Sequence, residues 1–272
     1  GFYQLQDLIG KYPPRPPKID FNVDEDLVTL PYTGGTTGLP KGAMITHRNL
    51  ISSEYLSSIF WGGVVEEGKE IVLAYLPFYH IYGQSVVMAG GISQGYTLVI
   101  FTTPDLDDIL NAIESYRATI FYSVPSLYEA LRDYARTDRV NWKRIKVLIS
   151  GADALLEDTA KGWEKRTGAK IHEGWGMTET SSVGIVSPYG QPRIGSFGIP
   201  ISNTVAAIAY PDKDEFMPVG ETGELVVRGP QITKGYWNKP DETRKMFMEV
   251  DGQRWLRTGD LVRMDADGYF YF

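Results

Sequence analysis

The sequence contains no cysteine among its 272 residues. Disulfides, thiolate metal sites and a cysteine nucleophile are therefore excluded. Basic residues are not in excess either: 27 Lys and Arg stand against 34 Asp and Glu, and the net charge of −7 argues against nucleic acid as a partner. No signal peptide opens the chain, and its longest mostly apolar stretch, 85–101, is interrupted by glycines and Gln94, so no integral membrane segment is expected. The default expectation is a soluble, cytoplasmic protein.

The composition of the chain fits an enzyme core. With 43% hydrophobic and 22% charged residues it can bury a substantial interior. The proline-rich stretch 11–17 cannot be helix or central strand, so residues 1–26 are expected to run over the surface as a lead-in. Residues 27–191 are expected to form an α/β subdomain. After about residue 192, short β runs alternate with Gly, Pro and Asp, which predicts a smaller, mainly β subdomain over 192–272.

Short β-rich runs alternate with helical periodicity in the first of these subdomains. Strands are predicted at 71–76, 96–101, 119–122, 145–150 and 170–172, and helices at 48–60, 106–116, 126–136 and 157–166. This alternation predicts an α/β fold in which a largely parallel sheet is covered by helices. Ligands of such sheets bind beyond the carboxyl ends of the strands.

The densest group of ligand-binding residue types is Tyr-Thr-Gly-Gly-Thr-Thr-Gly-Leu-Pro-Lys-Gly at 32–42. Glycines let the backbone approach an anion, threonine hydroxyls donate hydrogen bonds, and the lysine adds a positive charge. Such a loop predicts a phosphate site. A glycine-rich turn without a chemical role is the alternative.

The loop does not match a P-loop NTPase, whose pattern is G-x-x-x-x-G-K-[ST]. Counting from Gly35 places Pro40 where the second glycine belongs, and Gly42 replaces the Ser or Thr that would bind magnesium. Residues 43–46 predict a second short strand before a helix begins near His47. A loop between two strands cannot lend a helix N-terminus to the phosphates, so its threonines and lysine must contribute more.

The run 32–42 resembles the phosphate-binding signature of the adenylate-forming superfamily, which includes acyl-CoA synthetases, luciferases and the adenylation domains of peptide synthetases. Gly34 stands where many members have serine, so one hydroxyl is absent. The resemblance implies layered αβ sheets flanked by helices, with a smaller β-barrel-like subdomain. It also implies that the phosphates of ATP are bound by Thr33, Gly34, Gly35, Thr36, Thr37, Gly38 and Lys41.

Two more segments resemble adenine-binding parts of the same superfamily. The loop after the apolar run 145–149 has small residues that allow close approach of a flat ring, although a plain strand-to-helix turn is the alternative. Residues 174–180 resemble the family's Gly-Tyr-Gly-x-Thr-Glu, with Trp175 in place of the usual tyrosine. The indole keeps a face for stacking but lacks the phenolic hydroxyl and its hydrogen bond. The implied adenine contacts are Gly151, Ala152, Asp153, Gly174, Trp175 and Gly176.

Catalytic, metal and ribose roles follow from the same resemblance. Thr178 is expected to donate to the α-phosphate, and Glu179 to bind Mg²⁺, which usually takes only one or two protein carboxylates. Together with Lys41 they are the expected catalytic residues, and an exposed surface charge is the alternative for Glu179. Asp260 matches the aspartate that accepts hydrogen bonds from the ribose hydroxyls.

The segment 76–83, Leu-Pro-Phe-Tyr-His-Ile-Tyr-Gly, resembles the part of acyl- and aryl-CoA synthetases whose histidine borders the carboxylate pocket. His80, Tyr82 and Gly83 are therefore expected to form the acyl-binding wall. A lone histidine that satisfies the core is the alternative.

These resemblances imply ATP-dependent activation of a fatty acid through an acyl-adenylate and transfer to coenzyme A, with ATP and Mg²⁺ required. A 4-coumarate-like aryl-acid CoA ligase or an acyl-AMP ligase shares every motif, and a catalytically silent nucleotide-binding module is the alternative from another class. A homodimer and a peripheral membrane contact stay open. The superfamily's small C-terminal domain, with its catalytic lysine, matches no residue here, so we expect the isolated chain to turn over negligibly.

Overall fold

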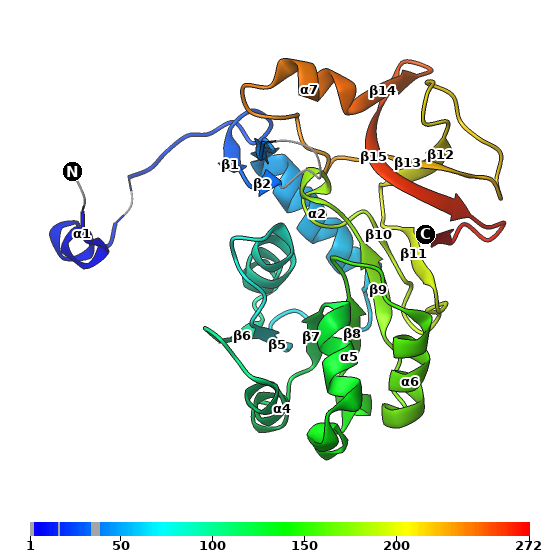
Figure 1. Ribbon diagram of the computed structural model, residues 1–272. Coiled ribbons are helices and arrows are strands. Elements are labelled where there is room, and N and C mark those ends of the chain that lie inside the picture. Colours follow the sequence, from blue (N-terminus) through cyan, green and yellow to red (C-terminus); the bar gives the residue numbers. More distant parts are fainter. Residues whose placement is uncertain (1–2, 16, 34–38) are drawn as a thin grey trace.

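The computed structural model describes residues 3–15, 17–33 and 39–272, and a twelve-stranded sheet runs through it (Figure 1). One half of the sheet is parallel and has the order β6-β5-β7-β8-β9. Its strands are β5 (Ile71–Ala74), β6 (Thr97–Ile100), β7 (Ile120–Ser123), β8 (Val147–Ser150) and β9 (His172–Trp175). Each overlaps one predicted strand, and the parallel sheet is confirmed.

The other half is antiparallel and continues the same sheet in the order β10-β11-β16-β15-β13-β12, with β14 paired to β15. Its strands are β10 (Ile185–Val186), β11 (Ser196–Pro200), β12 (Val205–Ala209), β13 (Thr222–Arg228), β14 (Phe247–Val250), β15 (Gln253–Met264) and β16 (Phe270–Tyr271). The halves join where β10 pairs antiparallel with β9. The sequence pattern predicts neither this junction nor the full length of β15, because polar residues interrupt its apolar ones.

Four helices of the structure correspond to the predicted ones: α2 (His47–Phe60), α4 (Leu106–Ser115), α5 (Pro125–Asp133) and α6 (Glu157–Thr167). Their ends follow local rules. Thr46 and Asn49 form a capping box on α2, and Asp105 caps α4 in the same way. Pro125 occupies the first turn of α5, and Gly168 ends α6 with a φ of 69°.

Several short elements are not predicted from the sequence. The apolar stretch after His80 forms a π-helix, η1 (Tyr82–Ala89), which continues into α3 (Gly90–Ser93). The helices α1 (Leu5–Lys11) and α7 (Pro240–Lys245) lie outside the predicted set as well. The short strand pairs β1 (Leu27–Thr29) with β4 (Ile45–Thr46) and β2 (Tyr32–Thr33) with β3 (Lys41–Gly42) flank the predicted phosphate loop.

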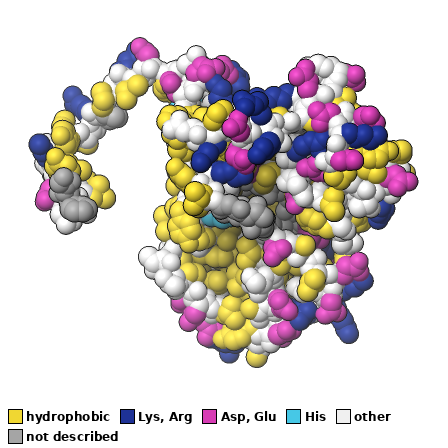
Figure 2. All heavy atoms as spheres, turned by 45° about the horizontal axis from the view of Figure 1, so that its top comes forward, with side chains coloured by type: hydrophobic (Ala, Val, Ile, Leu, Met, Phe, Trp, Pro, Cys, Tyr) yellow, Lys and Arg dark blue, Asp and Glu magenta, His cyan; other side chains and the backbone are white. Residues whose placement is uncertain are grey.

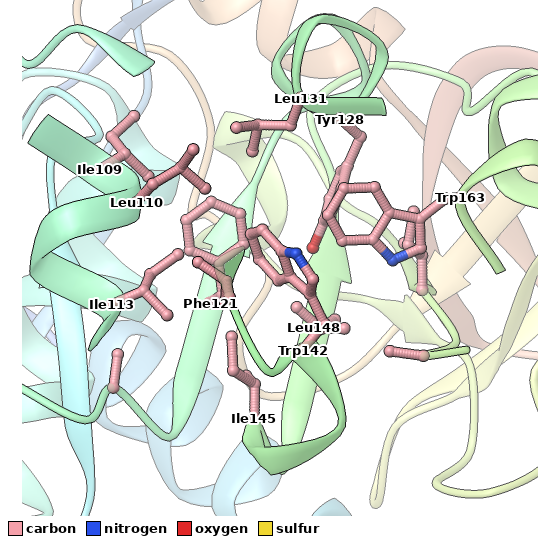
Figure 3. Close-up of a cluster of buried hydrophobic side chains, with 14 of the residues drawn as sticks. Ile109, Leu110, Ile113, Phe121, Tyr128, Leu131, Trp142, Ile145, Leu148 and Trp163 are labelled. Carbon is pink, nitrogen blue, oxygen red and sulfur yellow. The ribbon is translucent and has the colours of Figure 1, made fainter. Parts of the chain in front are cut away.

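The main apolar core packs α4, α5 and α6 against β7 and β8 (Figure 3). Trp142 and Trp163 meet edge to face at 4.6 Å between ring centroids, and the Trp142 indole N–H donates to the carbonyl of Thr137. The Tyr128 hydroxyl donates to the carbonyl of Ile149 on β8. A second cluster covers the opposite face of the sheet with residues of α2 and η1. The two clusters fix the strand ends that carry the predicted site.

The N-terminal arm extends away from the rest of the molecule (Figures 1 and 2). No residue of α1 is buried, and the arm exposes the large apolar side chains Tyr3, Leu5, Ile9, Tyr12, Ile19 and Phe21. In the part of the chain that the structure describes, every helix is too short or too polar to cross a membrane.

Candidate active site

A cavity of about 680 Å³ lies beyond the carboxyl ends of β8 and β9, between the hairpin β2–β3 and strand β15. It collects most of the predicted site residues from segments far apart in the chain. Those on its wall are Thr33, Lys41, His80, Tyr82, Gly151, Ala152, Gly174, Trp175, Gly176, Thr178, Glu179 and Asp260. Gly34, Gly35, Thr36, Thr37 and Gly38 lie outside the described residues. Gly83 and Asp153 are described but do not line the cavity.

Lys41 reaches the cavity from β3, where it pairs with Thr33 of β2 across the antiparallel hairpin. Strands β2 and β3 thus flank the predicted phosphate loop on its two sides. The Lys41 ammonium lies 3.5 Å from a carboxylate oxygen of Glu242 in α7 and 4.6 Å from the ring centroid of Tyr236. A cation over an aromatic face and beside a carboxylate is held near the wall of the cavity.

Thr178 and Glu179 occupy a single 3₁₀ turn, η4 (Thr178–Thr180), which follows β9. Thr178 is half-buried, whereas Glu179 is only 3% exposed. Gly176 allows the chain to fold back at this point, because a Cβ there would lie 1.6 Å from the carbonyl oxygen of Ser182. The alternative of an exposed surface charge for Glu179 is excluded.

Hydrogen bonds with side chains of two helices and with the backbone of residues 231–233 hold this turn in place. The carbonyl of Ser181 accepts hydrogen bonds from Ser53 of α2 and Ser85 of η1 at 2.9 Å each. The Ser181 hydroxyl donates to the carbonyl of Gln231, and the N–H of Thr233 donates to the carbonyl of Glu179. The position of the two predicted catalytic residues is therefore determined by tertiary contacts.

Tyr236 is a cavity residue that the sequence motifs do not assign. Its hydroxyl donates to Oε1 of Glu179, and its ring faces Lys41. Burial and the neighbouring Glu179 raise the pKa of Tyr236, so the phenol stays protonated and remains a donor. The other oxygen of Glu179, Oε2, has no hydrogen-bond partner among the described residues. The sequence signal is the Gly-Tyr-Trp-Asn segment at 235–238, whose turn residues by themselves indicate architecture more than catalysis.

Trp175 and Asp260 meet across the cavity. The indole Nε1–H of Trp175 donates to Oδ2 of Asp260 at 2.8 Å, and burial raises the pKa of this carboxyl. Trp175 is 7% exposed, and its ring lies close to Gly184, where a Cβ would come within 2.7 Å. The replacement of tyrosine by tryptophan removes a phenol, but the indole supplies a different hydrogen bond to the predicted ribose ligand.

The adenine loop after β8 divides into residues that face the cavity and one that does not. Gly151 is buried against the ring of Tyr82, and Ala152 is exposed with a φ of 71°. Asp153 is also exposed, and its carboxylate accepts the N–H of Ala154. Its side chain stabilises the turn itself.

The predicted acyl wall is similarly divided. His80 is exposed at the cavity rim, where its Nδ1 accepts the N–H of Tyr82 at 3.2 Å. Tyr82 is buried, and its hydroxyl has no hydrogen-bond partner within the described part of the chain. Gly83 is needed for packing: a Cβ there would lie 2.3 Å from the carbonyl oxygen of Pro77. Apolar residues complete this wall, namely Trp61, Val65, Ile81, Val86, Val147, Ile149, Val183 and Val186.

Glu54 is a second unassigned cavity residue and the one acidic side chain that α2 adds to the wall. The Ser85 hydroxyl and Oε1 of Glu54 are 2.6 Å apart, and burial raises the pKa of the Glu54 carboxyl to about 8. Its sequence signal is the spacing of Glu54, Ser57, Ser58 and Trp61, which places all four on one helix face.

The fold and the cavity agree with what comparison with known proteins shows. A family model described as AMP-binding enzyme matches residues 4–237, and the chain belongs to this family. A long-chain-fatty-acid–CoA ligase of Bacillus subtilis is 39% identical over 256 residues, which cover 94% of this chain and 44% of that protein. The chain thus spans less than half the length of this curated relative.

Solved structures confirm the predicted fold class. ATP-bound MatB from Rhodopseudomonas palustris superimposes with a TM-score of 0.88 and 32% identity over 98% of this chain and 51% of that one. A long-chain-fatty-acid–CoA ligase from Archaeoglobus fulgidus matches with a TM-score of 0.87 and 26% identity over 98% of this chain and 55% of that one. The mixed α/β architecture with one large sheet is therefore that of the acyl-CoA synthetase N-terminal domain.

Proposed function

We propose that this chain forms the nucleotide- and acid-binding part of an AMP-forming acid–CoA ligase. One observation carries the proposal: a single cavity brings Lys41, Thr178, Glu179 and Asp260 together with an apolar wall that ends at His80. Such a cavity can hold a nucleotide and an apolar carboxylic acid side by side. The family match and the names of the relatives support the same activity.

The reaction has two steps. A carboxylate oxygen of the acid attacks the α-phosphorus of ATP, and the bond to the bridging oxygen breaks, so that pyrophosphate leaves with its electron pair. The sulfur of coenzyme A then attacks the acyl carbonyl, AMP leaves, and the thiol proton is released. Transfer to a phosphorus centre needs chiefly positioning and neutralisation of charge.

The residues on the cavity wall divide these tasks. Lys41 and Thr33, with the loop between them, bind phosphates, and the Thr178 hydroxyl donates to the α-phosphate. Asp260 accepts from the ribose, and the small residues after β8 together with Trp175 flank the adenine. None of these side chains needs to act as a covalent nucleophile.

Glu179 fits a role as magnesium ligand. Its carboxylate is buried at the cavity, Oε1 is fixed by Tyr236, and Oε2 lacks a hydrogen-bond partner among the described residues. Over the described ranges, no group of three or more His, Cys, Asp and Glu side chains suits a metal, so the ion would depend on this carboxylate and on phosphates. When bound, Mg²⁺ neutralises phosphate charge.

We propose a fatty acid as the substrate. The apolar wall of the cavity and the long-chain-fatty-acid–CoA ligases among the relatives support this choice. An aryl acid, or transfer to a carrier protein instead of coenzyme A, remains compatible with the same residues. We further propose a cytoplasmic location. We also propose that turnover requires the parts of the relatives that this chain does not cover. The experiments therefore use a full-length enzyme, that is, a protein of the relatives' length that contains this chain.

The test is ATP–pyrophosphate exchange by the full-length enzyme with Mg²⁺ and a panel of fatty and aromatic acids, followed by addition of coenzyme A. We expect exchange with fatty acids, and thioester formation once coenzyme A is present. No exchange with any acid, by folded protein that binds ATP, would favour a catalytically silent nucleotide-binding module. Exchange without thioester would favour an acyl-AMP ligase.

A further inference from the structure

One face of helix α2 forms part of the apolar end of the cavity and is unusually polar. Glu54, Ser57, Ser58 and Trp61 follow one another at intervals of three and four residues, and all four line the cavity. Three of these four residues are polar, whereas a wall built only to hold a hydrocarbon chain would carry apolar side chains at positions 54, 57 and 58, because burying a polar group without a partner is unfavourable.

The two serines on this face are already satisfied. The Ser57 hydroxyl donates to the carbonyl of Ser53 at 2.7 Å, and the Ser58 hydroxyl donates to the carbonyl of Tyr55 at 2.8 Å. Glu54 differs from them: among the described residues its Oε1 contacts Ser85, whereas its Oε2 has no hydrogen-bond partner. That oxygen lies beside Gly90, where a Cβ would come within 2.4 Å of it. Because Gly90, the first residue of α3, has no side chain, it leaves room for the Glu54 carboxyl group at the cavity wall.

The contacts of Ser85 indicate that the Glu54 carboxyl is protonated. The Ser85 hydroxyl lies 2.6 Å from Oε1 of Glu54 and 2.9 Å from the carbonyl oxygen of Ser181. A hydroxyl has one proton to donate, and a carbonyl oxygen can only accept. Both contacts are hydrogen bonds only if Glu54 donates to Ser85 while Ser85 donates to Ser181. The raised pKa of Glu54, about 8 because of burial, agrees with this assignment.

A protonated Glu54 that donates through Oε1 presents Oε2 as a neutral acceptor. Ionised groups do not suit an apolar chamber, but a neutral acceptor can be paired by a hydroxyl of the ligand. A saturated chain lying over Oε2 leaves this acceptor without a hydrogen bond. Leaving an acceptor unpaired in such a site costs more free energy than a typical hydrogen bond contributes.

We propose that Glu54 is a specificity-determining residue that selects carboxylic acids carrying a hydroxyl group part-way along an otherwise apolar chain. The inference rests on the proposed function, because it assigns a substrate class to the same cavity. The hydroxyl donates to Oε2 of Glu54, while the substrate carboxylate lies toward Lys41 and Thr178.

The experiment compares saturated fatty acids with hydroxy acids of the same length in ATP–pyrophosphate exchange by the full-length enzyme. The hydroxyl is moved along the chain one carbon at a time. We expect a preference of about tenfold in kcat/KM for the hydroxy acid at one position or at two neighbouring positions, because only there does the donor reach Glu54. A general effect of polarity or solubility would not depend on position.

Two variants separate recognition from structure. In Glu54→Gln the amide N–H can donate to Ser85 and the amide oxygen can accept from the ligand, so the positional preference should persist. In Glu54→Leu both functions are absent, and the ratio of kcat/KM for the hydroxy acid to that for the saturated acid should fall to about one. A merely structural Glu54 would change exchange with both acids of a pair equally.

The outcomes distinguish the two levels of the proposal. Exchange with saturated acids but equal rates for every hydroxy acid overturns the role of Glu54 and leaves the proposed function intact. A preference that survives in Glu54→Leu also overturns it. A lack of exchange with all acids contradicts the proposed function itself, and binding of the paired acids to the ATP-loaded protein, measured by calorimetry, then decides whether Glu54 discriminates between them.

Discussion

Replacement of Glu54 by glutamine should change how the stability of the chain depends on pH. Burial raises the pKa of this carboxyl to about 8 from an ordinary value of 4.5. Between these values the folded state holds a proton that the unfolded chain has released. The contribution of Glu54 to the free energy of unfolding therefore falls as the pH rises through this window, and it levels off above the folded pKa. Glutamine has no titrating proton and removes this contribution.

The size of the effect follows from the linkage between protons and folding. One proton held only by the folded state changes the free energy of unfolding by about 1.4 kcal/mol per pH unit. Between about pH 5.5 and about pH 7.5, both inside the window, the free energy of unfolding of Glu54→Gln should increase by about 2.7 kcal/mol relative to that of the unsubstituted chain. This is an upper value, because the half-buried side chain lines a cavity that admits water.

The assay is urea unfolding of both proteins at a series of pH values, with tryptophan fluorescence as the signal. The difference between the two proteins cancels the contributions of His172 and Glu173, whose pKa values burial moves to about 4 and about 7. Glu129→Gln, at an exposed position of α5, serves as the matched control and should show a flat difference. If the Glu54→Gln difference is equally flat, the carboxyl titrates normally and the protonation argued from Ser85 is wrong.

Three further substitutions test the cavity in the full-length enzyme. Gly176→Ala places a Cβ against the backbone, 1.6 Å from a carbonyl oxygen, so we expect destabilisation of at least about 3 kcal/mol and loss of nucleotide binding, measured by urea unfolding and calorimetry. Glu242→Gln removes the ion pair of Lys41, and ATP should bind about twofold to fivefold more tightly in a calorimetric titration, the range of an exposed pair. Tyr236→Phe leaves one oxygen of Glu179 without its donor, so the Mg²⁺ concentration needed for half-maximal ATP binding should change severalfold.

Each of these has a control elsewhere in the chain. Gly10→Ala adds a Cβ that meets nothing within 4 Å and should leave stability and binding unchanged or improved. Glu249→Gln removes an exposed carboxylate of β14 and should not alter ATP affinity. Tyr271→Phe breaks a tyrosine–carboxylate contact with Asp265 outside the cavity wall and should not alter the Mg²⁺ response. Controls that behave like their partners would show that the effects are general.

The elements that the sequence predicts are those whose pattern is local. The apolar run at 145–150 and the amphipathic stretch at 106–116 correspond to β8 and α4, because strand and helix periodicity depend on neighbouring residues. The π-helix η1 lies outside such rules, since no residue pattern distinguishes its hydrogen bonds from those of an α-helix. β10 is only two residues long, too short for a pattern.

The same distinction applies to the candidate site. Thr178 and Glu179 are predicted together because they lie in one contiguous motif. The partner of Glu179, Tyr236, is 57 residues away, and the partner of Glu54, Ser85, is 31 residues away. Sequence spacing places Glu54 on the same helix face as Trp61, but it does not show that this face lines the cavity. Gly83, expected on the acyl-binding wall, does not line the cavity and lies instead in a tight backbone contact with Pro77.

The hydrogen bond between Trp175 and Asp260 connects the fold directly to the proposed chemistry. The two residues are 85 positions apart, and they belong to β9 and β15, which lie in the parallel and antiparallel halves of the sheet. The contact therefore bridges the cavity between the two halves. It also uses one acceptor site on Oδ2 of Asp260, so the ribose must bond to the remaining acceptor sites of the carboxylate or displace the indole. In the first case Trp175 orients the carboxylate for the nucleotide; in the second, nucleotide binding would release a contact that joins the two halves of the sheet.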